Sequence, residues 1–99
     1  MIAVHVTCKD ISEAKSIAKH LLSKKLVVCA NMIPMQSMYL WKKQIQESAE
    51  VLLILKTKES NIKAIETEVK KLHSYDVPYI GIFQEKTTAA IEKWLNEEL

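Results

Sequence analysis

The sequence predicts a small α+β domain with strand and helix patterns in the order βαββαβ, followed by one more helix. Along the 99 residues, segments in which every second side chain is apolar are followed by segments with apolar side chains at helical spacing. This succession of strands and helices is typical of two βα-type halves. The composition, 48% hydrophobic and 26% charged, is that of an ordinary globular protein. We therefore expect one domain over residues 1–99 with one modest core.

The first strand and helix follow directly from the spacing of apolar side chains. Residues 2–7 alternate between large apolar and small or polar side chains, which predicts a strand with one face in the core. Asp10 and Glu13 form a start resembling a capping box, and the following helix should end near Leu26. Its apolar stripe consists of Ile11, Ala14, Ala18, Leu21 and Leu22.

The middle of the chain predicts a long, interrupted strand pair. Residues 27–33 are rich in β-branched side chains and predict a strand, which Pro34 interrupts as a bulge, a bend or an edge position. Strand character resumes over residues 38–41. Residues 42–47 are polar and predict the hairpin connection, and residues 49–57 predict the next strand.

A continuous apolar run at residues 51–55 predicts a strand that is buried on both faces. A single layer of helices covers only one face of a sheet. We therefore expect the other face to meet a neighbouring subunit, and a domain this small gains stability by associating with copies of itself.

The last third of the chain predicts a helix, a strand and a helix. Ser60 is expected to cap the second helix, which residues 73–78 end, and residues 79–83 predict the fourth strand. Thr88 is expected to cap the last helix. The whole order is that of a ferredoxin-like fold with helices on one face and an extended hairpin between its second and third strands. The apolar positions of these two helices are Ile62, Ile65, Val69 and Leu72, then Ile91, Trp94 and Leu95.

Charge and motifs exclude several classes of function. The formal net charge is +2 and all 14 basic residues are lysines, so sites built on the arginine fork are absent and neither a nucleic acid nor a membrane is an expected partner. The strand at residues 51–56 is aliphatic and offers no platform for stacking RNA bases. The single glycine, Gly81, rules out glycine-rich nucleotide loops. We expect no organic cofactor and identify no catalytic constellation.

The chain carries no visible targeting or membrane segment. Residues 1–6 enter a strand pattern without a basic region or a long apolar stretch, and no apolar run approaches the roughly 20 residues of a membrane span. Two cysteines are too few for a disulfide scaffold. We expect a cytoplasmic protein with reduced thiols.

Cys8 and His73 are the candidates for metal binding. Cys8 lies where the first strand meets the first helix, and a helix N-terminus lowers the pKa of a partly exposed thiol. His73 follows the second helix. If the fold joins them, they suit copper or zinc; otherwise Cys8 is a small apolar loop residue and His73 complements a helix dipole. Cys29 is expected to pack in the core.

Lys56 and Trp41 have both a structural and a functional interpretation. Lys56 follows the apolar run of the third strand as a solvated strand end, or it is buried at a subunit junction and paired with Glu50, Asp76 or a bound anion. Trp41 lies close to other large apolar side chains on one strand, which is typical of an interface or a core.

Four ordered motifs resemble those of one known family. They are Cys29-Ala30-Asn31, Tyr39-x-Trp41, Glu50-Val51 with Leu55-Lys56-Thr57, and His73-x-Tyr75-Asp76-Val77-Pro78. In this order and spacing the chain resembles the divalent cation tolerance family, CutA. The resemblance covers essentially the whole chain, up to the helix with Trp94 and Leu95.

The resemblance implies a tight ferredoxin-like homotrimer whose strands join edge to edge between subunits. It also implies binding of a divalent metal ion such as Cu(II), with Cys8 and His73 as ligands, and a role in metal tolerance or response. An alternative is a trimeric sensor resembling the PII signalling proteins, in which Lys56 and Glu50 hold a small anionic ligand. The implied intersubunit pocket is lined by Cys29, Trp41, Glu50, Lys56, Tyr75 and Asp76.

The sequence departs from the family pattern at three positions. The hairpin Trp41-Lys42-Lys43 lacks the glycine that is common there, so we expect a different turn geometry. Ser74 replaces the proline that usually follows the histidine. Tyr79 replaces an acidic residue that is frequent after the last proline.

Overall fold

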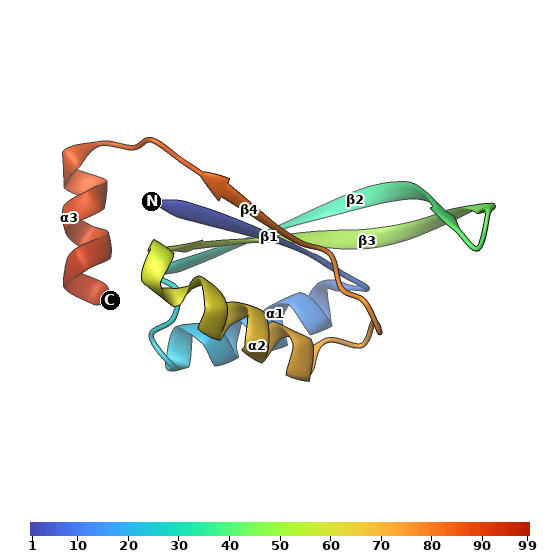
Figure 1. The fold of residues 1–99 in the computed structure, drawn as a ribbon, viewed down its shortest axis with the longest axis horizontal. Coiled ribbons are helices and arrows are strands. Elements are labelled where there is room, and N and C mark those ends of the chain that lie inside the picture. The colour runs from blue at the N-terminus through green and yellow to red at the C-terminus, as the bar shows by residue number, and fades with distance from the viewer.

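The computed structural model describes residues 1–99 as a four-stranded antiparallel sheet with two helices on one face and a third helix beyond one end (Figure 1). The strand order across the sheet is β2-β3-β1-β4, and the predicted ferredoxin-like βαββαβ fold is confirmed. The elements are β1 (Ile2–Cys8), α1 (Ile11–Ser23), β2 (Cys29–Trp41), β3 (Gln44–Thr57), a 3₁₀ turn (Glu59–Asn61), α2 (Ile62–Leu72), β4 (Ile80–Gln84) and α3 (Ala89–Glu98).

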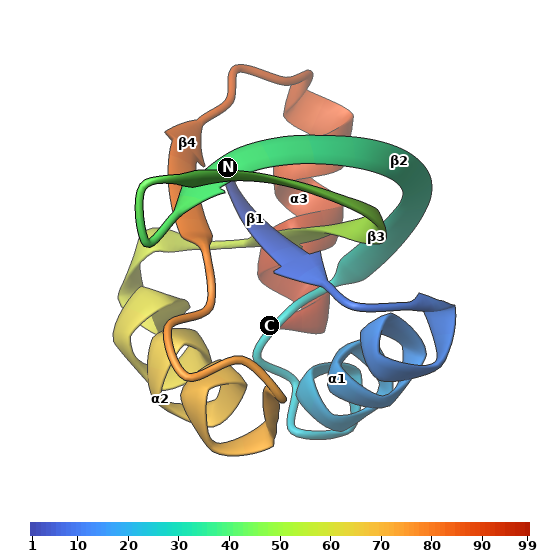
Figure 2. The same cartoon turned by 90° about the vertical axis from the view of Figure 1, so that its right-hand side faces the viewer.

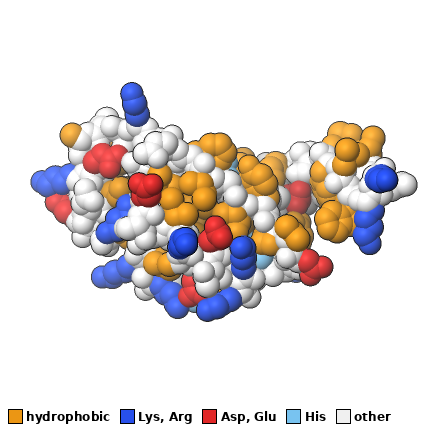
Figure 3. Space-filling model, in the orientation of Figure 1, with side chains coloured by type: hydrophobic (Ala, Val, Ile, Leu, Met, Phe, Trp, Pro, Cys, Tyr) orange, Lys and Arg blue, Asp and Glu red, His pale blue; other side chains and the backbone are white.

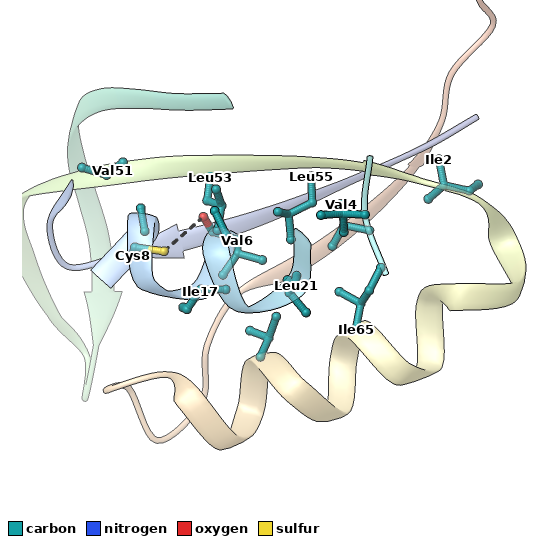
Figure 4. Close-up of a cluster of buried hydrophobic side chains, with 14 residues drawn as sticks. Ile2, Val4, Val6, Cys8, Ile17, Leu21, Val51, Leu53, Leu55 and Ile65 are labelled. Carbon is teal, nitrogen blue, oxygen red and sulfur yellow. Dashed lines mark hydrogen bonds between the residues drawn. The ribbon is translucent and has the colours of Figure 1, made fainter. Parts of the chain in front are cut away.

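The core lies between the sheet and the pair α1 and α2, which run side by side beneath it (Figure 2). On β3, Val51, Leu53 and Leu55 alternate toward the helices and are buried (Figure 4). Ile17 of α1 and Ile65 of α2 are buried in the same cluster. The period of two on the strand and the helical spacing on α1 and α2 therefore meet in one apolar layer.

Helix α1 begins as predicted but ends early. The Asp10 carboxylate accepts a hydrogen bond from the Glu13 N–H at 2.8 Å, which confirms the cap. The helix ends at Ser23 rather than near Leu26, because Lys25 takes a left-handed conformation with φ of 56°. The Leu26 carbonyl is then free to accept a hydrogen bond from the Thr57 hydroxyl at 2.7 Å.

Strand β2 is continuous, and the predicted interruption at Pro34 is wrong. The strand begins at Cys29, two residues after the predicted start, and passes through Pro34, which pairs with Val51. Pro34 does not interrupt β2 because β2 is an edge strand. At an edge, a missing N–H on the outer side costs no hydrogen bond between strands. Of the three options for Pro34, the edge position is confirmed.

The hairpin turn is much shorter than predicted. It consists of Lys42 and Lys43 alone, with φ values of 52° and 64°, and β3 begins at Gln44. Positive φ at both turn residues is the conformation that matches the twist of a two-residue hairpin. Lysine thus adopts here the backbone conformation that glycine adopts without strain.

Replacing Lys43 by glycine is expected to stabilise the protein by about 1 kcal/mol, because a side chain in the left-handed region costs roughly 1–2 kcal/mol. The control is Lys43→Ala, which removes the same charge but keeps the Cβ atom. Thermal unfolding at one fixed protein concentration measures the difference. Equal midpoints for the two variants would show that charge, not backbone strain, sets the effect.

The remaining helix and strand boundaries are close to those predicted, but one predicted helix cap is wrong. Ser60 lies inside the 3₁₀ turn, and the residue before α2 is Asn61, whose side chain makes no cap hydrogen bond. Asn61 instead donates to the Leu26 carbonyl at 3.2 Å. Strand β4 starts at Ile80, one residue later than predicted. Thr88 caps α3 as expected, accepting from the Ile91 N–H at 3.3 Å.

The sheet face opposite the helices has no covering layer within one chain. Leu52 and Ile54 of β3 point to this face and are half-buried, while Ile33, which pairs with Leu52, and Phe83 on β4 are exposed. Hydrophobic side chains gather over the middle of the molecule and at the end of the hairpin (Figure 3). The second apolar face predicted from residues 51–55 is therefore present. No helix is long and apolar enough to cross a membrane.

Candidate functional site

Three potential metal ligands meet where β1 ends, α1 begins and α2 ends. The sulfur of Cys8, a carboxylate oxygen of Glu13 and a ring nitrogen of His73 all lie within 4.8 Å of one another. The fold therefore joins the two predicted ligands across 65 residues of sequence. Glu13 is a third donor, which the sequence pattern indicated only as a capping residue. Its place in the first turn of α1, directly after Cys8, was the available signal.

His73 is held rigidly in this cluster. Its side chain is fully buried, Nε2 lies 2.7 Å from the Thr7 carbonyl oxygen, and Nδ1 lies 3.0 Å from the Tyr75 amide nitrogen. A carbonyl can only accept and an amide N–H can only donate, so Nε2 carries the proton and Nδ1 accepts. His73 is thus a neutral imidazole with both nitrogens bonded. Nε2 is 3.8 Å from the Glu13 carboxylate.

Cys8 is a buried thiol, which favours the interpretation as a small apolar residue over that as a partly exposed thiolate. Its side chain packs in the core with Sγ 4.0 Å from the Val6 carbonyl oxygen (Figure 4). Burial raises the pKa of Cys8 to about 12, and the nearby carboxylates of Glu13, Asp10 and Glu50 add to the rise. Burial and negative charge outweigh the N-terminus of α1.

Glu13 links the start of α1 to the segment after α2. Its two oxygens accept hydrogen bonds from the Lys9 N–H at 3.0 Å and the Ser74 N–H at 2.9 Å. Burial opposes ionisation, yet the hydrogen bonds from Ser74 and Lys9 hold the pKa of Glu13 below its ordinary value. A proline at position 74 would have no N–H, so this bond depends on a residue at which the chain departs from the family pattern.

A cleft of about 770 Å³ lies beside this cluster, between the hairpin and residues 74–79. We call it the hairpin cleft. Four of the six residues predicted for an intersubunit pocket line it, whereas Cys29 and Lys56 do not. The lining residues are Thr7, Gln36, Ser37, Met38, Tyr39, Trp41, Glu50, Ser74, Tyr75, Asp76, Val77 and Tyr79.

Glu50 is the most buried acidic side chain of the hairpin cleft. Only 7% of the residue is exposed, and its Oε2 accepts a hydrogen bond from the Tyr75 hydroxyl at 2.6 Å. Burial, that hydrogen bond and the charge of Glu50 all raise the pKa of Tyr75. The phenol is therefore the donor and the carboxylate the acceptor.

Lys56 and Cys29 lie elsewhere on the sheet within one chain. Lys56 is six residues from Glu50 along β3, which corresponds to about 20 Å. Its ammonium group binds both oxygens of Glu85, at 2.6 and 2.9 Å, so its partner is neither Glu50 nor Asp76. Cys29 pairs with Lys56 across β2 and β3 and is half-buried rather than packed in the core.

The structure thus defines a ferredoxin-like domain with a compact sulfur, nitrogen and oxygen donor cluster next to an acidic, aromatic cleft. Comparison with known families agrees with this class. The family model described as CutA1 divalent ion tolerance protein matches residues 2–98. The chain belongs to the CutA1 family, which confirms the resemblance.

Individual relatives match over nearly their whole length. The divalent-cation tolerance protein CutA of Pyrococcus horikoshii is 38% identical over 99 residues, covering 99% of this chain and 97% of the relative. The corresponding protein of Thermococcus kodakarensis is 38% identical over 95 residues, covering 95% and 91%. The solved structure of the periplasmic divalent cation tolerance protein CutA from Archaeoglobus fulgidus superposes with a TM-score of 0.95 at 33% identity, covering 99% of this chain and 98% of the other.

Proposed function

We propose that the protein is a homotrimer that binds a divalent cation, copper or a similar ion, at the cluster of Cys8, Glu13 and His73, with a role in the response to metal ions. The convergence of these three donors within 4.8 Å carries the proposal. Membership of a divalent ion tolerance family supports it.

The donor set fits such an ion in type and spacing. Sulfur and imidazole nitrogen suit copper and zinc, and a carboxylate completes a site with three protein ligands. Cys8, Glu13 and His73 would hold the cation, which would supply positive charge to this cluster. The chain must then release the thiol proton of Cys8 and give up a hydrogen bond of His73, so binding competes with the contacts that hold the cluster closed.

Titration with Cu(II) and with Zn(II), followed by calorimetry, tests the site. We expect one ion per chain in the wild type and a loss of affinity of roughly a hundredfold in Cys8→Ala and in Glu13→Gln, because each removes a direct ligand. Cys29→Ala is the matched control, since it removes the other free thiol and should bind as the wild type does. Unchanged affinity in Cys8→Ala would show that this cluster does not bind the ion.

The affinity of the site is expected to rise with pH. Since the pKa of Cys8 is about 12, the thiol is protonated at neutral pH and each bound ion must displace that proton. The apparent association constant should therefore increase roughly tenfold per pH unit between about pH 7 and pH 9. Zinc titrations at several pH values measure the slope. A flat profile would show that the Cys8 sulfur is not a ligand.

The outer half of the hairpin supports the proposed trimer. Residues 44–50 of β3 pair with β2 alone, because β1 begins to pair with β3 only at Val51. A two-stranded ribbon is marginally stable in water, yet this one exposes Leu40 by 74% and Ile45 by 71%. Contacts with neighbouring copies would cover these side chains and the open face of the sheet.

A further inference from the structure

We propose that the open face of the sheet is an interface between copies of this chain that opens when His5 gains a proton. The open face is the side opposite the helices, and it carries Leu52, Ile54 and Phe83. In the trimer proposed above, on which this inference rests, neighbouring copies cover that face.

His5 lies near the middle of the open face. It belongs to β1, which lies between β3 and β4, and it pairs with Ile54 on β3 and Gly81 on β4. Its chain neighbours Val4 and Val6 point into the core, so the His5 side chain points to the opposite side. The residue is half-buried in one chain. The imidazole is therefore among the side chains that a neighbouring copy would cover.

Apolar groups flank the imidazole. The ring centroids of His5 and Phe83 are 4.4 Å apart. A Cβ atom on Gly81 would lie 2.7 Å from the Tyr79 hydroxyl oxygen and 3.1 Å from the Phe83 ring, so both aromatic side chains reach over this glycine. The Tyr79 hydroxyl is titratable, but a phenol is uncharged in acid and neutral solution. The surroundings of His5 are thus aliphatic on the β3 side and aromatic on the β4 side.

His5 has no hydrogen-bond or ion-pair partner, in contrast to the other two histidines. A ring nitrogen of His20 lies 3.4 Å from a Glu68 oxygen, and one of His73 lies 2.7 Å from the Thr7 carbonyl oxygen. No residue offers such an acceptor to His5. Water is therefore the group that stabilises a protonated His5 ring in a single chain.

The charged groups on the open face do not favour an imidazolium at this position. Lys56 is a diagonal neighbour of His5, because it pairs with Ala3 two residues earlier on β1. Both oxygens of Glu85 bind the Lys56 ammonium group, at 2.6 and 2.9 Å. Glu50 is four residues along β3 from the residue that pairs with His5, which corresponds to about 13 Å. A proton on His5 therefore adds positive charge beside Lys56 and meets no free carboxylate.

Assembly and protonation of His5 therefore oppose each other. In a free chain, water solvates the half-exposed imidazolium, whereas a covering subunit removes that water and leaves the charge unpaired. The assembled state then binds fewer protons at this position than the free chains do. Association consequently weakens as the pH falls and is strongest where the imidazole is neutral. Histidine side chains generally change charge between about pH 5 and pH 8, which sets the expected range.

Subunit exchange tests the proposal on the full-length chain, with a chelator present and at constant ionic strength. Isotopically labelled and unlabelled trimers are mixed, and native mass spectrometry follows the formation of mixed trimers. From about pH 7.5 to about pH 5, we expect the exchange rate of the wild type to rise roughly tenfold or more, because each chain takes up a proton. The rates are compared at pH values at which circular dichroism shows folded chains.

Variants at position 5 separate charge from packing. His5→Gln stays neutral and polar, and His5→Phe stays neutral and keeps a ring, so the exchange rate of both should change less than about threefold. His5→Lys carries a positive charge at both pH values and should exchange quickly even at about pH 7.5. His20→Gln is the matched control, since it removes a histidine from the helical side and should follow the wild type.

Three outcomes would overturn the proposal alone. Equal pH dependence in the wild type and the two neutral variants would show that another group controls the assembly, and a flat profile of the wild type would show that none does. Failure of both neutral variants to assemble would mean that a hydrogen bond of the ring, not its charge, holds the interface. A monomeric wild type at about pH 7.5 would refute the proposed trimer as well, whereas the other results leave the trimer standing.

Discussion

Replacing Leu40 and Ile45 together by threonine is expected to convert the proposed trimer into monomers. These residues face each other across the hairpin and are both more than 70% exposed in one chain. Threonine is β-branched and strands favour it, so the fold of a single chain should change little. In the proposed trimer the same change removes two exposed apolar side chains per subunit, whose burial between subunits would stabilise the contact.

Light scattering after size exclusion at micromolar concentration measures the effect. Three chains of 11.3 kDa give a mass of about 34 kDa, and the double variant should elute as a single chain of 11.3 kDa. Ile11→Thr, on α1 at the helical side of the sheet, is the control and should leave the mass unchanged. A wild-type monomer would refute the trimer, and an intact trimer in the double variant would place the hairpin end outside the interface.

Replacing Leu53 by alanine is expected to cost about 3 kcal/mol of the free energy of unfolding. Leu53 is fully buried on β3, between Val6 of β1 and Met32 of β2, and faces the helices. Removing a buried leucine side chain loses its transfer free energy and leaves a cavity, which together cost about 2–5 kcal/mol. In a protein of this size such a loss consumes much of the whole stability.

Denaturant unfolding at a fixed protein concentration measures this change, since the stability of an oligomer depends on concentration. Leu53→Met is the matched control; it conserves side-chain volume and should cost less than about 1.5 kcal/mol. If both variants lost the same stability, the site would be sensitive to shape in general and the cavity would not be the cause.

The candidate metal cluster was partly readable from the sequence. The resemblance to CutA singled out Cys8 and His73, and the structure brings their side chains together. Glu13 was visible as a capping residue, but its second role depends on the Ser74 N–H reaching back to it across the fold. Of the two interpretations of Cys8, the structure favours the small apolar residue over the activated thiolate, because burial in the packed core raises the pKa of the thiol.

The hairpin between β2 and β3 was also predicted only in part from the sequence. Its existence follows from two adjacent strand patterns, yet its length was underestimated because polar residues at 44–47 look like a loop. They pair in register with β2 all the same, since a two-residue turn at Lys42 and Lys43 closes the ribbon. Pro34 is likewise tolerated because β2 lies at the edge, which depends on strand order.

The sequence by itself determined the order and type of the elements, the helical caps at Asp10 and Thr88, and the family. These features depend on local spacing, which alternation and helical periodicity record directly. Only the tertiary structure decided that Lys56 pairs with Glu85, that His73 is a neutral imidazole, and that Glu50 faces an aromatic cleft. Partners, protonation and burial depend on atoms that are distant along the chain, and no local pattern encodes them.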